Sequence, residues 1–306
     1  MVAANPPLTE YVGEFLDVCF RTRILSLLSV DDIIQDLVTW LTDHDILNNT
    51  YILYTSDHGY HLGQWRLMCP KRQMYQTDIH VPLYIRGPTI PAQSYTDILA
   101  ANVDLTPTIL DLLGLTIPSS VDGKLNLKKI KILLVVKCCC CVVHTIQKKK
   151  RSFASWIGNY PKHNRKESSA SWRDVFLFEY REVSTGYGNI CITWIPNTDG
   201  TYFPGQVLSG PSTNPEGIPY IVADLASNSY RGLRILNATQ NWSYGEFVNT
   251  TWTNASLQYP NFYELYDLNT DPFQMKNIYD TLTAQVKAQL HNMIMSYGSC
   301  QGQSCP

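Results

Sequence analysis

The sequence is poor in charged residues and contains no long apolar run, and both shortages narrow what the chain can be. Asp, Glu, Lys and Arg make up 16% of the 306 residues, and the formal net charge is -2 at pH 7. Such a balance gives no electrostatic reason to expect a nucleic-acid partner. A membrane-spanning helix needs about 20 apolar residues. The best candidate, residues 132–143, is shorter and is broken by Lys137, so we expect no transmembrane segment.

The start of the chain also lacks a secretory signal peptide, because residues 1–10 contain neither a basic start nor an apolar stretch. Other features nevertheless predict the secretory pathway. Five Asn-x-Ser/Thr glycosylation sequons occur, at Asn48, Asn237, Asn241, Asn249 and Asn254. Cys300 and Cys305 are spaced for a small disulfide loop, which an oxidising compartment would permit. A truncated chain, with its signal in a missing upstream part, reconciles these observations.

A compact set of chemistry-bearing residues follows one apolar segment. Residues 50–56 are β-branched and aromatic, which predicts a buried strand. Asp57, His58 and Gly59 come next, and Lys71 lies a little further on. Residues that leave the carboxyl end of such a strand face the binding crevice of α/β folds. Gly59 would allow the tight turn that brings Asp57 and His58 to one centre. The alternative is a solvated loop in which Asp57 caps the next segment.

Eight segments of the sequence carry a family resemblance in the same order along the chain. They are residues 28–32, 54–61, 71–75, 78–83, 86–88, 102–111, 121–123 and 264–272. Together they resemble the C-terminal part of type I sulfatases, in the branch of the N-acetylglucosamine-6-sulfatases and extracellular 6-O-endosulfatases. The resemblance implies an α/β, alkaline-phosphatase-like sulfatase fold, here partial, with a small C-terminal antiparallel-sheet subdomain.

The resemblance also implies roles for the residues behind the first strand. Asp57 and His58 match a pair of ligands for one divalent cation, usually Ca²⁺, and Lys71 matches a lysine that contacts the sulfate. A carboxylate suits calcium, whereas an imidazole suits it less well. Lys71 could otherwise belong to a solvated basic pair with Arg72. His61 could contact a sugar hydroxyl or the leaving oxygen, or it could be structural.

The nucleophile of that family is a formylglycine, made from the cysteine of a Cys-x-Pro-Ser-Arg motif. Neither Cys69, followed by Pro70, Lys71 and Arg72, nor Cys19 fits this motif. The resemblance therefore implies that the formylglycine and the first two metal aspartates lie in an upstream half. Without them, we expect the isolated chain to be inactive.

Residues 124–150 do not fit the sulfatase pattern. They are rich in lysine at both ends and contain four consecutive cysteines, 138–141, which cannot all bind one tetrahedral zinc ion. Removing this stretch would join Gly123 to Arg151. The joined sequence would then read Asp-Gly-Arg-Ser-Phe, which matches the Asp-Gly-Arg/Lys-Ser-Phe/Leu sequence that is typical of sulfatases at this point. We therefore interpret it as a retained intron or gene-model error, or else as a basic surface loop. On this interpretation, residues 1–123 belong to the catalytic domain, and residues 151–306 form the remainder of the core and the C-terminal subdomain.

Periodicity and turn residues predict the remaining elements. Helices are expected at residues 31–47, with Ser29 or Asp31 as cap, at 104–113 with Pro107 in the first turn, and at 281–296. The 31–47 helix is expected to pack one face on the sheet. Strands are expected at residues 81–85, 172–180, 190–195, 220–225, 230–236 and 262–268.

Three functions are consistent with the sequence. The first is a sulfatase that removes 6-sulfate from glucosamine units of heparan or keratan sulfate, in the lysosome or outside the cell. The second is an inactive, sulfatase-like fragment that binds sulfated glycans. The third is a related metal-dependent phosphodiesterase. Lys71 and residues 264–272 favour sulfate over phosphate.

Overall fold

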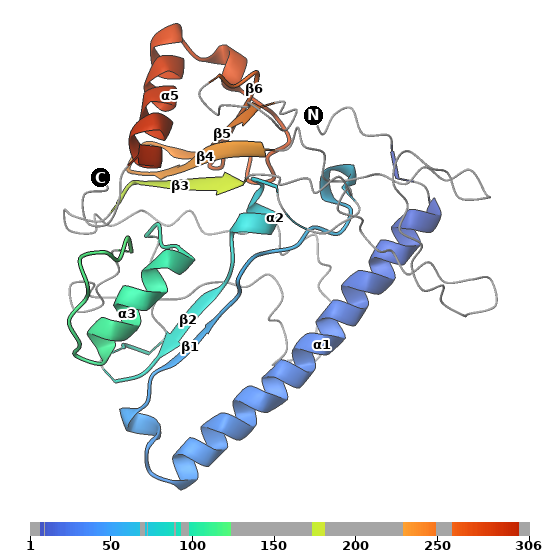
Figure 1. Cartoon of the computed structure of the whole chain (residues 1–306). Coiled ribbons are helices and arrows are strands. Elements are labelled where there is room, and N and C mark those ends of the chain that lie inside the picture. Colours follow the sequence, from blue (N-terminus) through green and yellow to red (C-terminus); the bar gives the residue numbers. More distant parts are fainter. Residues whose placement is uncertain are drawn as a thin grey trace, which may run out of the picture.

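The computed structural model describes a chain of two parts, one running from α1 to α3 and the other built on a four-stranded sheet (Figure 1). The described residues are 7–8, 10–67, 71, 73–88, 90–92, 98–123, 173–180, 229–248 and 259–299. The stretch 124–150 and the strands predicted at 190–195 and 220–225 lie outside them. The division of the chain around 124–150 therefore stays a prediction.

Helix α1 (Glu10–Asp43) is much longer than the sequence patterns predicted. The prediction of a helix that starts near residue 31 was wrong, because Ser29 and Asp31 lie inside α1 and cap nothing. Residues 14–30 contain no glycine or proline, so nothing interrupts the helix on its amino-terminal side. Shortly after its end, Asp45 adopts a positive φ of 57°, a conformation that aspartate tolerates and that does not continue a helix.

Most of α1 stands away from the sheets (Figure 1), so the prediction that it packs along one face was also wrong. Of the apolar residues that suggested this packing, Ile33 is 65% exposed and Leu37 is 42% exposed. Burial is confined to the two ends, at Val12, Leu16 and Leu41. The described part of the chain contains no helix long and apolar enough to cross a membrane.

The predicted strands on either side of residue 57 are present as β1 (Ile52–Thr55) and β2 (Leu83–Arg86). They pair antiparallel, and β1 is only partly buried, where we expected a buried strand. Ile85 packs with Leu53, Ile90 and Leu112. After β2 come η4 (Asn102–Asp104) and α3 (Leu105–Leu112), which has Pro107 in its first turn as predicted.

The C-terminal part is an antiparallel sheet in the order β3-β4-β5-β6, as the predicted subdomain required. Its strands are β3 (Val175–Tyr180), β4 (Ser229–Leu236), β5 (Asn241–Val248) and β6 (Phe262–Asp267). Strand β5 was not predicted, because its sequence combines a sequon with Gly245 and Glu246, which are unfavourable in strands. The glycine has a packing reason: a Cβ there would lie 2.3 Å from the sulfur of Met74.

Helix α5 (Ala284–Ser299) covers one face of this sheet (Figure 1). It begins three residues later than predicted, because η6 (Tyr279–Thr281) precedes it. The Thr283 hydroxyl then accepts a hydrogen bond from the amide of Val286, at 3.3 Å, as an N-cap does. Leu290 and Ile294 are buried against the sheet.

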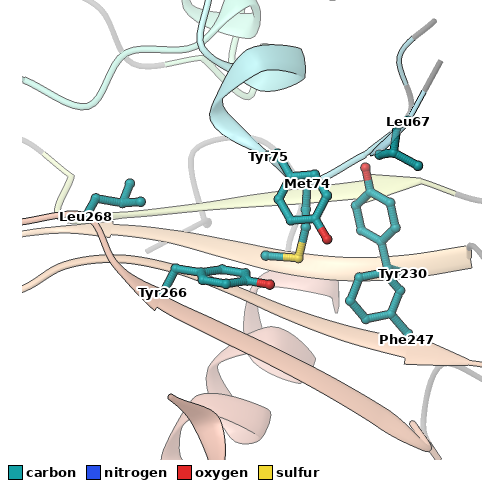
Figure 2. Close-up of a cluster of buried hydrophobic side chains, with 7 residues drawn as sticks. All are labelled: Leu67, Met74, Tyr75, Tyr230, Phe247, Tyr266 and Leu268. Carbon is teal, nitrogen blue, oxygen red and sulfur yellow. The ribbon is translucent and has the colours of Figure 1, made fainter. Parts of the chain in front are cut away.

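The opposite face of the sheet receives the segment before α2 (Gln76–Ile79). Met74 and Tyr75 lie over the aromatic rings of Tyr230, Phe247 and Tyr266 (Figure 2). Burying a side chain of this size contributes about 1.5–3 kcal/mol. This cluster therefore attaches the segment that follows Lys71 firmly to the C-terminal sheet.

A buried ion pair adds a second attachment between the two parts. The Arg173 guanidinium donates to the carboxylate of Asp104 at 2.6 Å, and both side chains are almost completely buried. Asp104 also accepts the amide hydrogen of Ala101, at 2.9 Å. Residues before 124 and after 172 are thus held together by both apolar and charged contacts.

Candidate functional site

The loop after β1 turns sharply because its backbone is bonded to the segment around α2. The amide of Gly59 donates to the carbonyl of Asp78 at 2.7 Å, and the amide of Tyr60 donates to the carbonyl of Thr77 at 2.8 Å. A Cβ on Gly59 would lie 1.8 Å from the Thr77 oxygen. Gly59 is therefore required for close approach of two backbones, and its φ is not positive.

This turn brings Asp57, His58 and Lys71 together, while their expected roles at a metal and a sulfate stay predictions. The Nε2 atom of His58 lies 3.2 Å from Oδ2 of Asp57, and Nζ of Lys71 is in hydrogen-bond contact with the same Nε2 atom. Asp57 is highly exposed and His58 is about one-third exposed. The three polar groups thus converge at an accessible point just past the carboxyl end of β1.

The hydrogen bonds of His58 define its tautomer. Nδ1 lies 2.6 Å from the carbonyl oxygen of Gly59, and because a carbonyl only accepts, Nδ1 carries the proton. When the ring is neutral, its lone pair is therefore on Nε2, beside Lys71 and Asp57. A lone pair held in place by a hydrogen bond at the other nitrogen is what a metal ligand needs.

The electrostatics of Asp57 favour its charged form. Slight desolvation raises the pKa of the carboxyl, but the backbone amide of His58, the His58 ring and the Lys71 ammonium outweigh it, so that the pKa lies below its usual value. The amide of His58 donates to Oδ1 of Asp57 at 3.0 Å. The surroundings of Asp57 therefore favour the ionised carboxylate, which is the form that a cation ligand needs.

Asn102 also positions this loop, and the sequence patterns did not identify it. Its Nδ2 donates to the carbonyl oxygens of Ser56 and Asp57, at 3.1 Å each. Asn102 lies in the 102–111 segment that resembles the sulfatases, but its helical pattern suggested packing alone. The loop is therefore held from two sides, by Asn102 and by the backbone at Thr77 and Asp78.

His61 is paired with the carboxylate of Asp78. Its side chain is fully buried, and Nδ1 is 2.8 Å from Oδ1 of Asp78. Asp78 also accepts from the amide of Gln73 and the hydroxyl of Thr77. Among the described residues, His61 Nε2 has no hydrogen-bond partner. The structure thus gives His61 a structural contact, and its role at a substrate stays a prediction.

The donor atoms of the converging residues fit part of a metal site. Asp57 offers a hard carboxylate oxygen and His58 offers a nitrogen lone pair, which together suit one side of a divalent cation. The described residues contain no group of three or more His, Cys, Asp or Glu side chains that could hold a metal. These two ligands are therefore a partial set that needs further donors.

A buried carboxyl group lies under the segment that follows Lys71. Glu264 in β6 is 3% exposed, and the hydroxyl of Tyr75 donates to its Oε2 at 3.2 Å. Burial raises the pKa of Glu264, against the lowering effect of hydrogen bonds from Tyr266 and Tyr75. This group belongs to the support of the site and has no contact with Asp57 or Lys71 that the structure shows.

The structure describes three of the predicted modification sites, Asn48, Asn237 and Asn241. Asn48 is exposed in η2 (Leu47–Asn49). Asn237 and Asn241 are half-buried, and their Nδ2 atoms donate to Gln240 at 2.8 Å and to Asn269 at 3.0 Å. Asn249, Asn254, Cys300 and Cys305 lie outside the described residues. Glycosylation and the terminal disulfide stay predictions.

Comparison with known proteins gives matches over nearly the whole chain. The family model described as Sulfatase matches residues 13–115. The N-acetylglucosamine-6-sulfatase of Homo sapiens is 32% identical over 303 residues, which are 99% of this chain and 45% of that protein. The extracellular sulfatase SULF-1 homolog of Drosophila melanogaster is 40% identical over 124 residues, 40% of this chain and 11% of that protein.

A solved structure supports the fold class. It is a complex of a protein with its substrate D-glucosamine-2-N,6-O-disulfate, and it matches with a TM-score of 0.53 and 23% identity over 88% of this chain and 38% of that one. The sulfatase-type, alkaline-phosphatase-like fold expected from the sequence is thereby confirmed. The chain spans about 45% of the length of the N-acetylglucosamine-6-sulfatases that it matches.

Proposed function

We propose that the chain forms one side of the active site of a sulfuric ester hydrolase, in the N-acetylglucosamine-6-sulfatase branch of the type I sulfatase family. The convergence of Asp57, His58 Nε2 and Lys71 Nζ at the end of β1 carries this proposal. Two side chains that can bind a metal ion, next to a lysine ammonium, are the arrangement expected where a sulfate is held between a metal and a basic group.

Each of the three residues has a role that follows from its charge. The Asp57 carboxylate and the His58 Nε2 lone pair would hold one divalent cation, for which Ca²⁺ is the family's expectation. When bound, such a cation withdraws electron density from sulfate oxygens. The Lys71 ammonium is a compact point charge with three donors, and it would bind a sulfate oxygen. Asn102 keeps the loop in the conformation that presents both ligands.

The substrate that we propose is the 6-sulfate ester of N-acetylglucosamine or glucosamine units in glycosaminoglycans such as heparan or keratan sulfate. The names of the relatives support it, as does the disulfated glucosamine bound to the structural relative. The sequons favour a lysosomal or extracellular site of action. The formylglycine nucleophile and further metal ligands would come from sequence upstream of residue 1.

Two preparations test the proposal. The first is the 306-residue chain alone, for which we expect no release of sulfate from N-acetylglucosamine-6-sulfate in the presence of Ca²⁺, because a nucleophile and most ligands are missing. The second is the chain extended by the upstream genomic sequence, provided that it encodes an in-frame Cys-x-Pro-Ser-Arg motif and paired aspartates. We expect the extended protein to hydrolyse the ester.

In the extended protein, Lys71→Ala should lower kcat/KM by about 100-fold or more, the usual effect of removing one group that stabilises transition-state charge. Lys287→Ala, which removes a partly exposed lysine of α5, is the matched control and should leave the rate unchanged. Sulfate release by the short chain, or an extended protein that cleaves phosphodiesters better than sulfate esters, would contradict the proposal. An upstream region without the motif would favour an inactive glycan-binding fragment.

A further inference from the structure

A groove lies on the α5 side of the C-terminal sheet, on the face opposite Met74 and Tyr75. Its volume is about 420 Å³, within the range of small-molecule sites. One wall is α5, and the floor is formed by the ends of β3, β4 and β5 near the turn between β4 and β5. The groove takes no part in the site at Asp57, because it lies on the other face of the sheet.

The lining of the groove has the chemistry of a site for a neutral sugar. Four amide side chains, Asn237, Gln240, Gln289 and Asn292, surround apolar groups that include Trp242 and Leu290. None of the described residues that line it carries a charge. Amides can both donate to and accept from hydroxyl and acetamido groups, and an indole offers an apolar surface for a sugar ring. A sulfated sugar would find no cation among these described lining residues.

Asn237, the first residue of the sequon Asn237-Ala238-Thr239, lines the groove. Oδ1 of Asn237 accepts from the amides of Thr239 and Gln240, at 3.0 and 2.8 Å, so the side chain is fixed in an Asx-type turn. One Nδ2 proton is donated to Oε1 of Gln240, and the other is the one that N-glycosylation replaces. Ala238 and Thr239 are exposed, so the turn is open to solvent.

We propose that Asn237 carries an N-linked glycan whose innermost N-acetylglucosamine residues lie in this groove, against Trp242 and the amides of Gln289 and Asn292. The glycan would cover the apolar wall between α5 and the sheet. Because the sugar is attached at the rim and the Asn237 side chain is already fixed, little freedom is lost when it docks. The other two sequon asparagines among the described residues do not line this groove.

The experiment uses the full 306-residue chain, secreted from mammalian cells behind a cleavable signal. Glycopeptide mass spectrometry would establish whether Asn237 is occupied, and thermal unfolding would compare Thr239→Ala, which removes the sequon, with Thr239→Ser, which retains it. We expect Thr239→Ala to lower Tm by about 2–4 °C relative to Thr239→Ser, the shift of a small loss of stability in a chain of this size. Asn48→Gln, at the exposed sequon, should change Tm by less than about 1 °C.

Two further measurements separate docking from a general effect of glycosylation. Trimming the folded protein to a single N-acetylglucosamine per site should retain most of the Tm difference, since the inner sugar makes the contacts. Gln289→Ala together with Asn292→Ala, on the exposed side of α5, should lower Tm when the glycan is present and leave it unchanged in the Thr239→Ala background. An unoccupied Asn237, an equal effect of Asn48→Gln, or a loss in both backgrounds would overturn the proposal.

Discussion

The two parts of this molecule differ in how completely they enclose their apolar side chains. The C-terminal sheet is covered on one face by α5 and on the other by Met74 and Tyr75, and Leu233, Tyr244 and Leu265 between them are fully buried. Helix α1, by contrast, leaves large apolar side chains exposed over most of its length. They are Val18, Phe20, Leu25, Leu28, Ile33, Leu37 and Trp40.

This difference shows how the proposed active-site residues are supported. Asp57, His58 and Lys71 belong to the less enclosed part, where β1 pairs only with β2 among the residues that the structure describes. Their loop is fixed through the α2 segment, and that segment is anchored by Tyr75 on the enclosed sheet. The site therefore depends on a connection between the parts. Substitutions at that connection should have larger effects than substitutions in the loop or at the buried carboxyl beneath it.

The largest effect is expected from Tyr75→Ala. Tyr75 is 2% exposed, stacks on Trp65 with ring centroids 4.3 Å apart, and contacts Tyr266. Removing such a ring from a core costs about 3–5 kcal/mol. We expect the free energy of unfolding measured with urea to fall by this amount, and the two parts to unfold in separate transitions. Tyr259→Ala, at a position that is 76% exposed, is the control, and an equal shift there would show that the contact does not connect the parts.

A smaller loss is expected from Gly59→Ala, which places a methyl group 1.8 Å from the carbonyl oxygen of Thr77. Relief of such a clash requires backbone movement, which costs about 1–3 kcal/mol. The movement would also separate Asp57 and His58 from Lys71.

The matched control is Gly13→Ala in α1, where no atom lies within 4 Å of the added Cβ. We expect it to stabilise the helix by about 0.5–1 kcal/mol, as measured by urea unfolding. Equal effects at the two glycines would refute the close-approach argument.

The smallest effect, and one that depends on pH, is expected from Glu264→Gln. Burial raises the folded-state pKa of Glu264 above the unfolded value of 4.5, so the folded state binds its proton more tightly. The stabilisation that the wild-type protein gains from protonated Glu264 is fully present below pH 4.5, and it is lost as the pH rises through the folded-state pKa. A tenfold difference in proton affinity between the folded and unfolded states corresponds to about 1.4 kcal/mol. The Gln variant should therefore have the higher Tm at pH 7.5 and no advantage at pH 4. The exposed Glu14→Gln is the control, and a pH-independent difference for Glu264→Gln would be inconsistent with this account.

Short patterns in the sequence were sufficient to predict β1, β2, β4, β6 and α3, because each has a distinct periodicity or a turn residue at its end. They were insufficient for α1 and β5. In α1, the patterns identified only the part from residue 31 onward, and in β5 the strand pattern is interrupted by Gly245 and Glu246. Both elements are therefore outcomes that local preference alone did not indicate.

The choice and order of residues already determined the family and the location of the polar cluster, since Asp57, His58 and Lys71 follow an apolar segment in a sulfatase-like order. Tertiary contacts decided the rest. Asn102 reaches Ser56 across 46 positions, His61 is buried on Asp78, and Gly59 is required by the backbone of Thr77. These contacts join residues far apart in the chain, so their geometry depends on how the elements pack, which no short sequence pattern encodes.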